Sequence, residues 1–339
     1  MKTEPGDKAP AKTTPEPVAV PQELDRSALD FLVRKFFGGS WNDARKKILR
    51  GEVLVDGMPL KVTDAKVLAG KMVSLGGKPQ RIKKGPELER EMIAHVDPHV
   101  IVIRKPAGIS TVRYPGEEID YSLEELVIDY LSRRKEKGTR NVRATVGVVH
   151  RIDKETSGLV MFTRSWAAKQ SLGQQFRFHT THRRYIAIAD GHVRATTIRS
   201  HLVENRGDGV RGSQEAVLAR FGRKIPGEGK LAVTHVRVIE SHEKASLVEC
   251  ALETGRTHQI RIHLSELGHP ILGDRVYSRG FPGVEDRAPR MMLHAAELGF
   301  IHPVTEREMR FEEPMPADMK KCWEKIVARA AAAETKESE

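Results

Sequence analysis

Apolar residues recur at helical spacing in several segments, most clearly after Ser122. Ser122 and Glu125 form a capping box, in which each side chain can accept a hydrogen bond from the other residue's backbone N–H. The apolar stripe of this predicted helix consists of Leu123, Leu126, Val127, Tyr130 and Leu131. Further helices are predicted at residues 27–50, as a pair with Ser40 as a cap, at 258–267, before the stop signals Gly268 and Pro270, and at about 317–333.

Runs of aliphatic and β-branched residues predict strands between these helices. They lie at residues 99–103, 158–162, 185–189, 233–239 and 246–252. Several runs alternate between apolar and polar residues, which favours an antiparallel or mixed sheet with one covered face. Within residues 53–59 a strand runs into an Asp56–Gly57 turn, and a second strand is predicted at residues 67–75. The expected fold class is therefore α+β, with a mixed, largely antiparallel sheet and a small α/β unit at the amino terminus.

Composition divides the chain into parts. Residues 1–22 contain five prolines and few apolar residues, so we expect a disordered tail. A small domain at 23–77, a basic linker at 78–90 and a large domain at 91–318 follow, and residues 319–339 form a carboxy-terminal helix and tail. Residues 207–229 are rich in Gly and Arg without a clear period, which predicts a long surface loop.

The overall composition excludes several classes of protein. No apolar run among the 339 residues approaches the roughly 20 residues of a membrane helix, so no membrane association is expected. Cys250 and Cys322 are too isolated for a disulfide framework or a zinc knuckle, which favours a reducing compartment. The amino-terminal residues resemble neither a secretory signal nor a transit peptide. We therefore expect a cytoplasmic protein.

The charge balance points to a polyanionic partner. Lys and Arg number 57 against 46 Asp and Glu, a formal net charge of +11. Nucleic acid is the favoured partner, and an anionic membrane surface is the alternative. A membrane surface would require a long amphipathic helix with one basic face, or a lipidation signal, and the sequence shows neither.

The stretch from His150 to Leu159 contains the first candidate for chemistry. Asp153 lies between Arg151 and Lys154, after an apolar strand and before a Thr-Ser-Gly turn. Nearby cations favour the ionised form of a carboxylate, which can then act as a nucleophile or a base. Asp153 can equally be a turn residue in a salt bridge, and these residues alone leave both interpretations open.

The stretch from Thr254 to Leu264 contains the second candidate. Gly255 permits a tight turn, and the helix that follows presents His258 and Arg261 on one face. The opening turn of this helix suits a phosphate, but a basic amphipathic surface helix is an equal alternative. His258 and His263 are five residues apart, which is not the spacing of a zinc helix, so no metal site is expected.

Both stretches resemble the two signature motifs of the RluA-type pseudouridine synthases. Further segments match this family in the right order, and together they span about residues 99–318: Lys105-Pro106-Ala107-Gly108, Arg184-Tyr185-Ile186-Ala187, Lys230-Leu231-Ala232-Val233-Thr234, Gly268-His269-Pro270-Ile271-Leu272-Gly273-Asp274 and Leu293-His294-Ala295-Ala296. Residues 27–77 resemble the small RNA-binding module named after ribosomal small-subunit protein four. In the loop after Gly108, Arg113 stands near a position where relatives often have His, so the role of residues 109–116 stays open.

The resemblance implies an isomerase that converts uridine in RNA to pseudouridine, in a catalytic domain with a central RNA-binding cleft. The base is detached, turned and rejoined through carbon 5, so atoms are conserved and no cofactor or metal is needed. Asp153 would be the catalytic carboxylate, by attack on the sugar or the uracil or by removal of a sugar proton. Arg261 would pair with Asp153, and Tyr185 would stack on the flipped uracil.

The resemblance also implies which residues bind RNA. Arg151 would hold the helix open after the target nucleotide leaves the stack. The other expected RNA-binding residues are Arg256, His258, Lys46, Lys47 and Arg50. The segment from Thr197 to Ser200 and the loop after it look closest to enzymes of large-subunit ribosomal RNA. Transfer RNA is the alternative substrate, a noncatalytic RNA-binding ribosome-assembly factor is the alternative function, and we expect a monomer.

Overall fold

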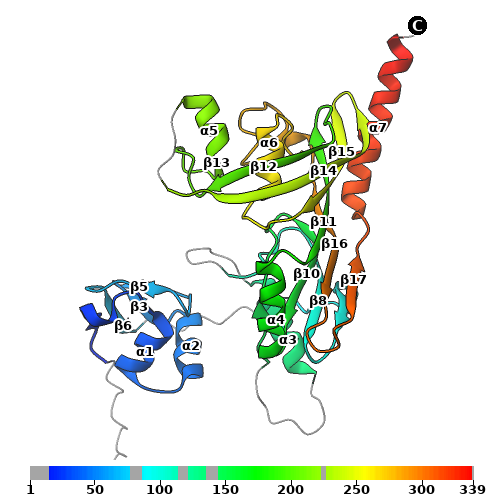
Figure 1. Cartoon of the computed structure of the whole chain (residues 1–339). Coiled ribbons are helices and arrows are strands. Elements are labelled where there is room, and N and C mark those ends of the chain that lie inside the picture. The colour runs from blue at the N-terminus through cyan, green and yellow to red at the C-terminus, as the bar shows by residue number, and fades with distance from the viewer. Residues whose placement is uncertain (1–14, 77–85, 114–120, 135–143, 223–226, 338–339) are drawn as a thin grey trace, which may run out of the picture. The chain divides into compact units, whose positions relative to one another are not determined.

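The computed structural model describes residues 15–76, 86–113, 121–134, 144–222 and 227–337 (Figure 1). The chain divides into two compact units. One contains residues 1–85 and 113–121, and the other contains residues 86–112 and 122–339. Most of the predicted tail and of the predicted linker, as well as residues 114–116 of the loop after Gly108, lie outside the described residues.

The amino-terminal unit combines two helices with short strands. The helices are α1 (Leu29–Phe37) and α2 (Trp41–Leu49), and the strands are β1 (Val18–Ala19), β2 (Ser27–Ala28), β3 (Val53–Val55), β4 (Met58–Pro59), β5 (Lys66–Val67) and β6 (Met72–Leu75). A four-stranded sheet has the order β1-β6-β3-β4, and β2 pairs with β5. As predicted, Ser40 caps α2: its Oγ accepts from the N–H of Asp43 at 3.1 Å. The core includes Leu29, Leu32, Ile48, Val53 and Val73.

The disordered tail predicted at residues 1–22 extends too far along the sequence. Val18–Ala19 pairs with β6, and Val20 is buried in the core of the unit. The proline-rich composition of residues 15–21 suggested disorder. Pro is nevertheless compatible with the edge strand of a sheet, so composition alone did not reveal this strand.

The larger unit is built on one eleven-stranded sheet. Its strands are β7 (Ile93–Val96), β8 (Val100–Lys105), β9 (Gly147–Val148), β10 (Ser157–Thr163), β11 (His182–Asp190), β12 (Thr196–Val203), β13 (Gly212–Ser213), β14 (Lys230–His242), β15 (Ala245–Leu252), β16 (Leu293–Ile301) and β17 (Glu308–Glu312). The main path runs β13-β12-β14-β15-β11-β16-β10-β8-β7, with β17 on β16 and β9 on β10. Only β10 and β16 pair in parallel among the described strands, which confirms the mixed, largely antiparallel sheet.

The parallel pair brings two backbones into close approach at Gly158. Gly158 has φ +109°, and a Cβ there would lie 2.2 Å from the carbonyl oxygen of Ala295. Glycine is therefore required where the loop that carries Asp153 enters β10. Figure 1 shows β12 and β14 running crosswise to β8 and β10, as expected of a strongly twisted sheet.

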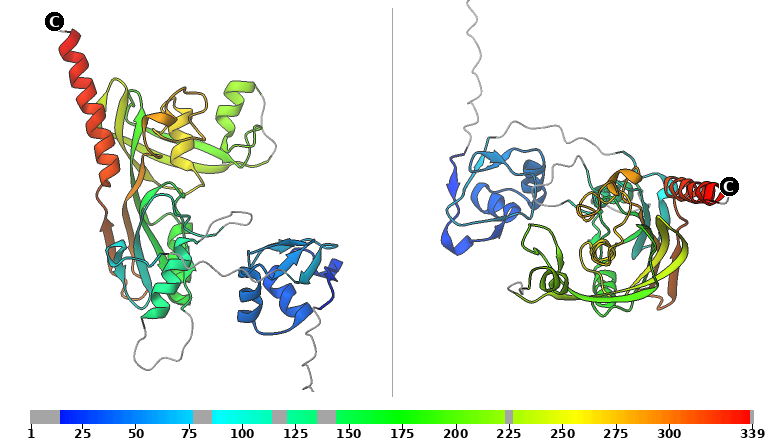
Figure 2. Two further views of the ribbon diagram at one scale, coloured as in Figure 1. Left: turned by 180° about the vertical axis from the view of Figure 1, so that it is seen from behind. Right: turned by 90° about the horizontal axis from the view of Figure 1, so that it is seen from above.

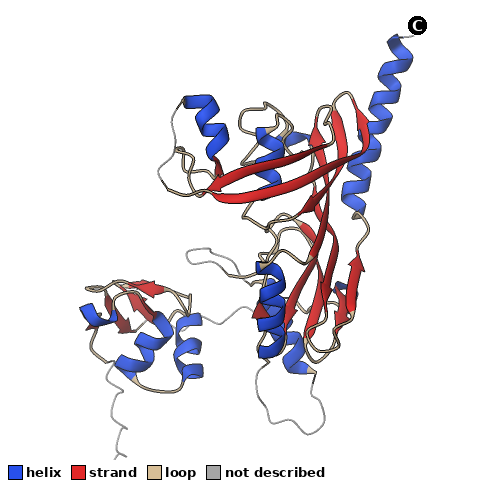
Figure 3. Cartoon of the chain, viewed as in Figure 1, coloured by secondary structure: helices blue, strands red, loops and turns tan. Residues whose placement is uncertain are grey.

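Helices cover this sheet (Figure 3). They are α3 (Leu123–Arg133), α4 (Trp166–Arg177), α5 (Gln214–Phe221), α6 (Gln259–Glu266) and α7 (Ala317–Glu337), with short 3-10 turns at Arg90–Met92 and Glu285–Arg287. The capping box predicted for Ser122 and Glu125 is present at the start of α3. None of the helices in the described ranges is long and apolar enough to cross a membrane.

Two expectations about this unit are corrected. The surface loop predicted at 207–229 contains β13 and α5, with Ser213 as the cap of α5. The boundary at residue 318 falls inside α7, whose Met319, Cys322 and Trp323 are buried in the main core cluster. As both views in Figure 2 show, α7 runs out from the body of this unit, so its first turns are the part that packs.

Candidate active site

An open cleft of about 700 Å³ lies in the larger unit. Most of its lining comes from the loop between β9 and β10, the carboxyl end of α4, β11, and the turn before α6 with the first residues of that helix. Asp153, Tyr185, His258 and Arg261 all line this cleft, as do Arg151 and Arg256. The structure therefore brings together every candidate residue predicted in this unit.

Hydrogen bonds with Thr111 and Thr156 hold the loop that carries Asp153 in place. Thr111 donates its hydroxyl to the carbonyl of Ile152 at 2.7 Å, and the N–H of Ile152 donates back to Thr111 Oγ1 at 3.3 Å. The N–H of Thr156 donates to the carbonyl of Asp153 at 3.1 Å, which closes the turn. The side chain of Asp153 remains 23% exposed and faces the cleft.

Lys105 fastens the same loop to the segment that follows β8. Its Nζ donates to the backbone carbonyls of Pro106, Ile109 and Lys154 at 2.8–3.0 Å. The side chain is almost fully buried, and burial lowers the pKa of Lys105 to about 7. The matched Lys-Pro-Ala-Gly segment thus holds the shape of the loop that carries Asp153.

Arg261 reaches from α6 to two carboxylates. Its Nε and Nη2 donate to Asp274 at 2.7 and 3.0 Å, and its Nη1 donates to Asp153 Oδ2 at 3.3 Å. The predicted pair with Asp153 therefore exists, but the shorter, bidentate contact is with Asp274. Burial opposes the charge on Arg261, yet hydrogen bonding and attraction from Asp274, with attraction from Asp153, outweigh it and raise the pKa of Arg261.

Asp274 and Tyr277 are site residues to which the sequence analysis gave no role. Asp274 is 1% exposed and accepts the N–H groups of Val276 and Tyr277. Burial opposes ionisation of Asp274, but Arg261 and these N–H groups outweigh it and lower the pKa of Asp274. The guanidinium carbon of Arg261 lies 4.9 Å from the ring centroid of Tyr277, a cation–π contact.

His258 occupies the opening of α6 beside the carboxylate. Its Nε2 lies 3.9 Å from Asp153 Oδ1, and its Nδ1 is 2.9 Å from the hydroxyl of Tyr277. Burial lowers the pKa of His258 despite the attraction of Asp153. Its left-handed backbone, φ +60°, accounts for the tight entry into the helix. His258 was predicted as an RNA-binding residue, and its geometry places it next to the candidate catalytic group.

Tyr185 forms part of the cleft wall on β11. Its ring is half-buried, and burial raises the pKa of Tyr185 to about 12. The phenol is therefore protonated near neutral pH and can donate a hydrogen bond. The ring of Tyr185 and the carboxylate of Asp153 line the same cleft.

The predicted RNA-binding residues fall into two groups. Arg151 is exposed at the cleft, and Arg256 lines it while its Nε donates to the carbonyl of Leu231 at 3.0 Å. Lys46 and Lys47 are on α2 of the amino-terminal unit, and Arg50 directly follows that helix. These three residues therefore belong to the other unit of the chain.

A second hollow of about 770 Å³ shares Gly255, Arg256 and Thr257 with the cleft. Arg206, Arg211 and Lys230 also line it. In the part of the chain that the structure describes, no three His, Cys, Asp or Glu residues are grouped to hold a metal ion. The candidate chemistry of the cleft is thus that of a carboxylate beside a guanidinium, an imidazole and a phenol.

The family described as RNA pseudouridylate synthase matches residues 99–266. Ribosomal large subunit pseudouridine synthase D of Zymomonas mobilis subsp. mobilis is 40% identical over 232 residues, which are 67% of this chain and 70% of that protein. The protein of the same name from Neisseria meningitidis serogroup A is 34% identical over 315 residues, 89% of this chain and 79% of its own. An uncharacterized RNA pseudouridine synthase of Bacillus subtilis is 38% identical over 240 residues, which are 69% of this chain and 72% of that protein.

A solved structure supports the fold. The human protein titled RNA Pseudouridylate Synthase Domain Containing 1 matches with a TM-score of 0.54 at 23% identity, covering 72% of this chain and 90% of that one. At this identity the match shows a shared fold, and it agrees with the α+β architecture built on one mixed sheet.

Proposed function

Because this chain belongs to the RNA pseudouridylate synthase family and is an isomerase of that kind, we propose that Asp153 is its catalytic carboxylate. One observation carries the assignment. Asp153 is held at the wall of an open cleft, 3.3 Å from the guanidinium of Arg261, with Tyr185 lining the same cleft. A carboxylate in this setting can act on a nucleoside that enters from solvent.

Arg261 orients Asp153 in this proposal. Two nitrogens of its guanidinium, Nε and Nη2, donate hydrogen bonds to Asp274. The third nitrogen, Nη1, is thereby fixed where it contacts Asp153. The guanidinium also stabilises the negative charge of the carboxylate before it reacts. Tyr185 then supplies a stacking face for the uracil, a contact of about 1–3 kcal/mol, and a donor for the edge of the base.

Everting the uridine leaves a gap in the RNA, and the lost stacking and pairing of the base cost a few kcal/mol of free energy. Arg151, exposed at the cleft, offsets part of this cost by occupying the gap. Asp153 begins the detachment of the base from its ribose, and the base turns and rejoins through carbon 5. All atoms of the uridine are retained, so the reaction needs no redox partner.

Large-subunit ribosomal RNA is the proposed substrate. Two relatives that are 40% and 34% identical carry the name ribosomal large subunit pseudouridine synthase D. The net charge of +11 agrees with a structured RNA substrate. Transfer RNA is the alternative substrate, and a noncatalytic assembly factor is the alternative function. We further propose that the protein acts as a cytoplasmic monomer.

The amino-terminal unit is proposed to be an RNA-binding module like that of ribosomal small-subunit protein four. Its helix pair carries basic residues on and after α2, among them Lys46, Lys47 and Arg50. Arg34 and Arg45 also lie over the ring of the exposed Trp41, at 4.9 and 5.8 Å. Basic side chains interleaved with an aromatic ring suit a phosphate backbone with unpaired bases.

Pseudouridine mapping across total RNA tests the substrate assignment. Cells with and without this protein are compared, and cells that carry the Asp153→Asn variant serve as the matched control. We expect one or more pseudouridines in large-subunit ribosomal RNA to disappear in both the deletion and the variant. Loss confined to transfer RNA would establish the alternative substrate, and unchanged maps would contradict the proposed function.

A further inference from the structure

Arg183 lies on β11 two positions before Tyr185. Alternate residues of a strand project from the same face, and both residues line the cleft. Their Cα atoms are therefore separated by about 7 Å along the strand. Any group bound at Arg183 lies within about one nucleotide of a base stacked on Tyr185.

The positive charge of Arg183 is buried without a counter-charge. Arg183 is 7% exposed, and in the described part of the chain no carboxylate lies within 4.0 Å of it. Its Nη2 donates to the backbone carbonyl of Glu253 at 3.0 Å, and its guanidinium carbon is 5.6 Å from the ring centroid of Phe176. Its Nε is buried with no hydrogen-bond partner among the described residues. Burial lowers the pKa of Arg183, as expected for an uncompensated cation.

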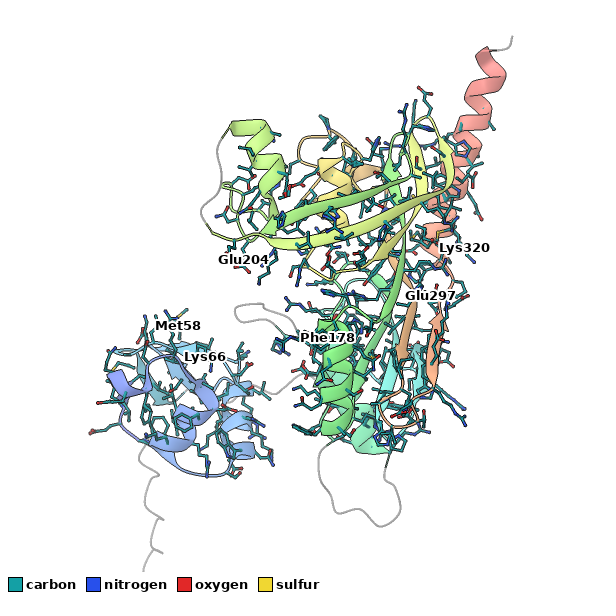
Figure 4. All side chains as sticks on the ribbon, in the orientation of Figure 1. Met58, Lys66, Phe178, Glu204, Glu297 and Lys320 are labelled. Carbon is teal, nitrogen blue, oxygen red and sulfur yellow. The ribbon has the colours of Figure 1, made fainter. Side chains whose placement is uncertain are left out.

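Two more basic side chains line the cleft beside Arg183. Arg256 has its Nε on the carbonyl of Leu231, and no carboxylate contacts it within the described ranges. His179 lines the same cleft as Arg183 and Arg256. Burial lowers the pKa of His179, and the charges of Arg183 and Arg256 lower it further, while the charge of Glu253 opposes them. Phe178, labelled in Figure 4, directly follows α4 and precedes His179 in the chain.

Gly255 makes room for this arrangement. A Cβ at position 255 would lie 2.3 Å from Nη1 of Arg183. Gln259 fixes the same turn, because its side-chain oxygen accepts from the N–H of Arg256 at 3.0 Å. The turn that carries Arg256 is therefore shaped around the buried guanidinium of Arg183.

We propose that Arg183 and Arg256 bind an RNA phosphate next to the everted target nucleotide. The inference rests on the proposed function, since it identifies a subsite of the same cleft. The phosphate supplies the counter-charge that Arg183 lacks, and N–H groups of the two guanidinium ions can donate to its oxygens. Arg183 then fixes the position of the backbone on one side of the base, while Tyr185 holds the base itself.

The salt dependence of RNA binding tests this subsite. The full chain, Arg183→Gln and the control Arg237→Gln are titrated with a large-subunit ribosomal RNA transcript over a range of salt concentrations. Arg237 is matched in charge, but its side chain is 63% exposed and bonds to Glu249 outside the cleft. We expect Arg183→Gln to weaken binding about tenfold and to reduce the slope of log affinity against log salt by about one, and Arg237→Gln to leave the slope unchanged.

Two further measurements separate binding from a structural role. Thermal unfolding of free Arg183→Gln is expected at or above the wild-type temperature, because an uncompensated buried cation is removed. A lowered unfolding temperature with an unchanged salt slope would overturn the proposal. Arg183→Lys keeps the charge and should retain the wild-type slope.

Neutral linkages in the RNA locate the phosphate. Single methylphosphonate linkages are placed on either side of the target uridine found by mapping. We expect one linkage to weaken binding by wild type and not by Arg183→Gln. Equal losses in both proteins at every linkage would refute the subsite. A wild-type chain that forms no pseudouridine would refute the proposed function instead, and the salt slope would still report on the subsite.

Discussion

Arg261 has two carboxylate partners that differ in burial. Asp274 is almost fully buried and meets the guanidinium through two hydrogen bonds, whereas Asp153 is partly exposed and meets it through one. The first contact holds the side chain of Arg261, and the second presents a charge to the cleft. At the residue scale, one arginine thus links a buried carboxylate to the proposed catalytic carboxylate.

Replacing each carboxylate separates these two tasks. Asp274→Ala leaves a buried guanidinium without its main partner, so we expect it to lower the free energy of unfolding by about 3–5 kcal/mol. Asp153→Ala, the matched control, is expected to change it by about 1 kcal/mol or less. Urea denaturation followed by circular dichroism measures both, and equal losses would contradict this division.

Sequence reasoning found the residues of the cleft that lie in signature motifs. Asp153 and Arg261 come from stretches whose charges and turns stand out locally, whereas Tyr185 was identified only through the resemblance to the family. Asp274 stood within a matched stretch but received no role, because sequence spacing does not show which acid a helical arginine will meet. Arg183 was also missed, since its significance lies in the absence of a carboxylate partner among the described residues, which only coordinates reveal.

At the scale of elements, local patterns predicted helices better than strands. Caps at Ser40 and Ser122 placed α2 and α3 correctly. The central strand β16 was missed, because His294 and Glu297 interrupt its apolar run. Both are buried at 2% exposure: His294 contacts Ser157 Oγ at 2.9 Å, and Glu297, labelled in Figure 4, accepts a hydrogen bond from Arg184 at 2.5 Å. These partners come from distant strands, so no local pattern reveals them.

His263 ties α6 to the sheet and should make stability depend on pH. Its Nε2 contacts Ser200 Oγ at 3.1 Å and its Nδ1 contacts Thr234 Oγ1 at 2.8 Å, and burial lowers the pKa of His263 to about 4. Between pH 6.5 and 4 the unfolded chain therefore binds a proton that the folded chain excludes. The free energy of unfolding should fall by up to about 3 kcal/mol as pH drops through this window.

Urea unfolding at a series of pH values checks this expectation. The His263→Gln side chain stays neutral, so this variant should lose less free energy of unfolding between pH 6.5 and 4 than wild type. Part of the loss of free energy should persist in the variant, because burial also lowers the pKa of His150. A variant with the pH dependence of wild type would contradict the assignment to His263.

At the scale of the whole molecule, the chain contains two units with their own cores. One core is formed by α1, α2 and the short strands, and the other by the large sheet with α6 and the first turns of α7. Composition predicted a small domain at residues 23–77, between a proline-rich segment and a basic stretch. Its amino-terminal edge was placed too late in the sequence, because β1 (Val18–Ala19) completes the small sheet.

Deleting residues 1–85 tests what the amino-terminal unit contributes. We expect the remaining chain to fold, to bind RNA more weakly and to show a smaller salt dependence of affinity, because fewer phosphates are neutralised. Affinity measured against salt concentration gives this slope. A deletion variant with the slope of the full chain would count against an RNA-binding role for this unit.

Pseudouridine formation by purified protein on a bare large-subunit ribosomal RNA transcript tests the account most directly. Wild type and Asp153→Asn are compared under the same conditions, with circular dichroism and RNA affinity confirming that the variant folds and binds. The account predicts pseudouridine with wild type and none with Asp153→Asn, although both bind RNA. A variant that still forms pseudouridine would contradict the assignment of the chemistry to this carboxylate.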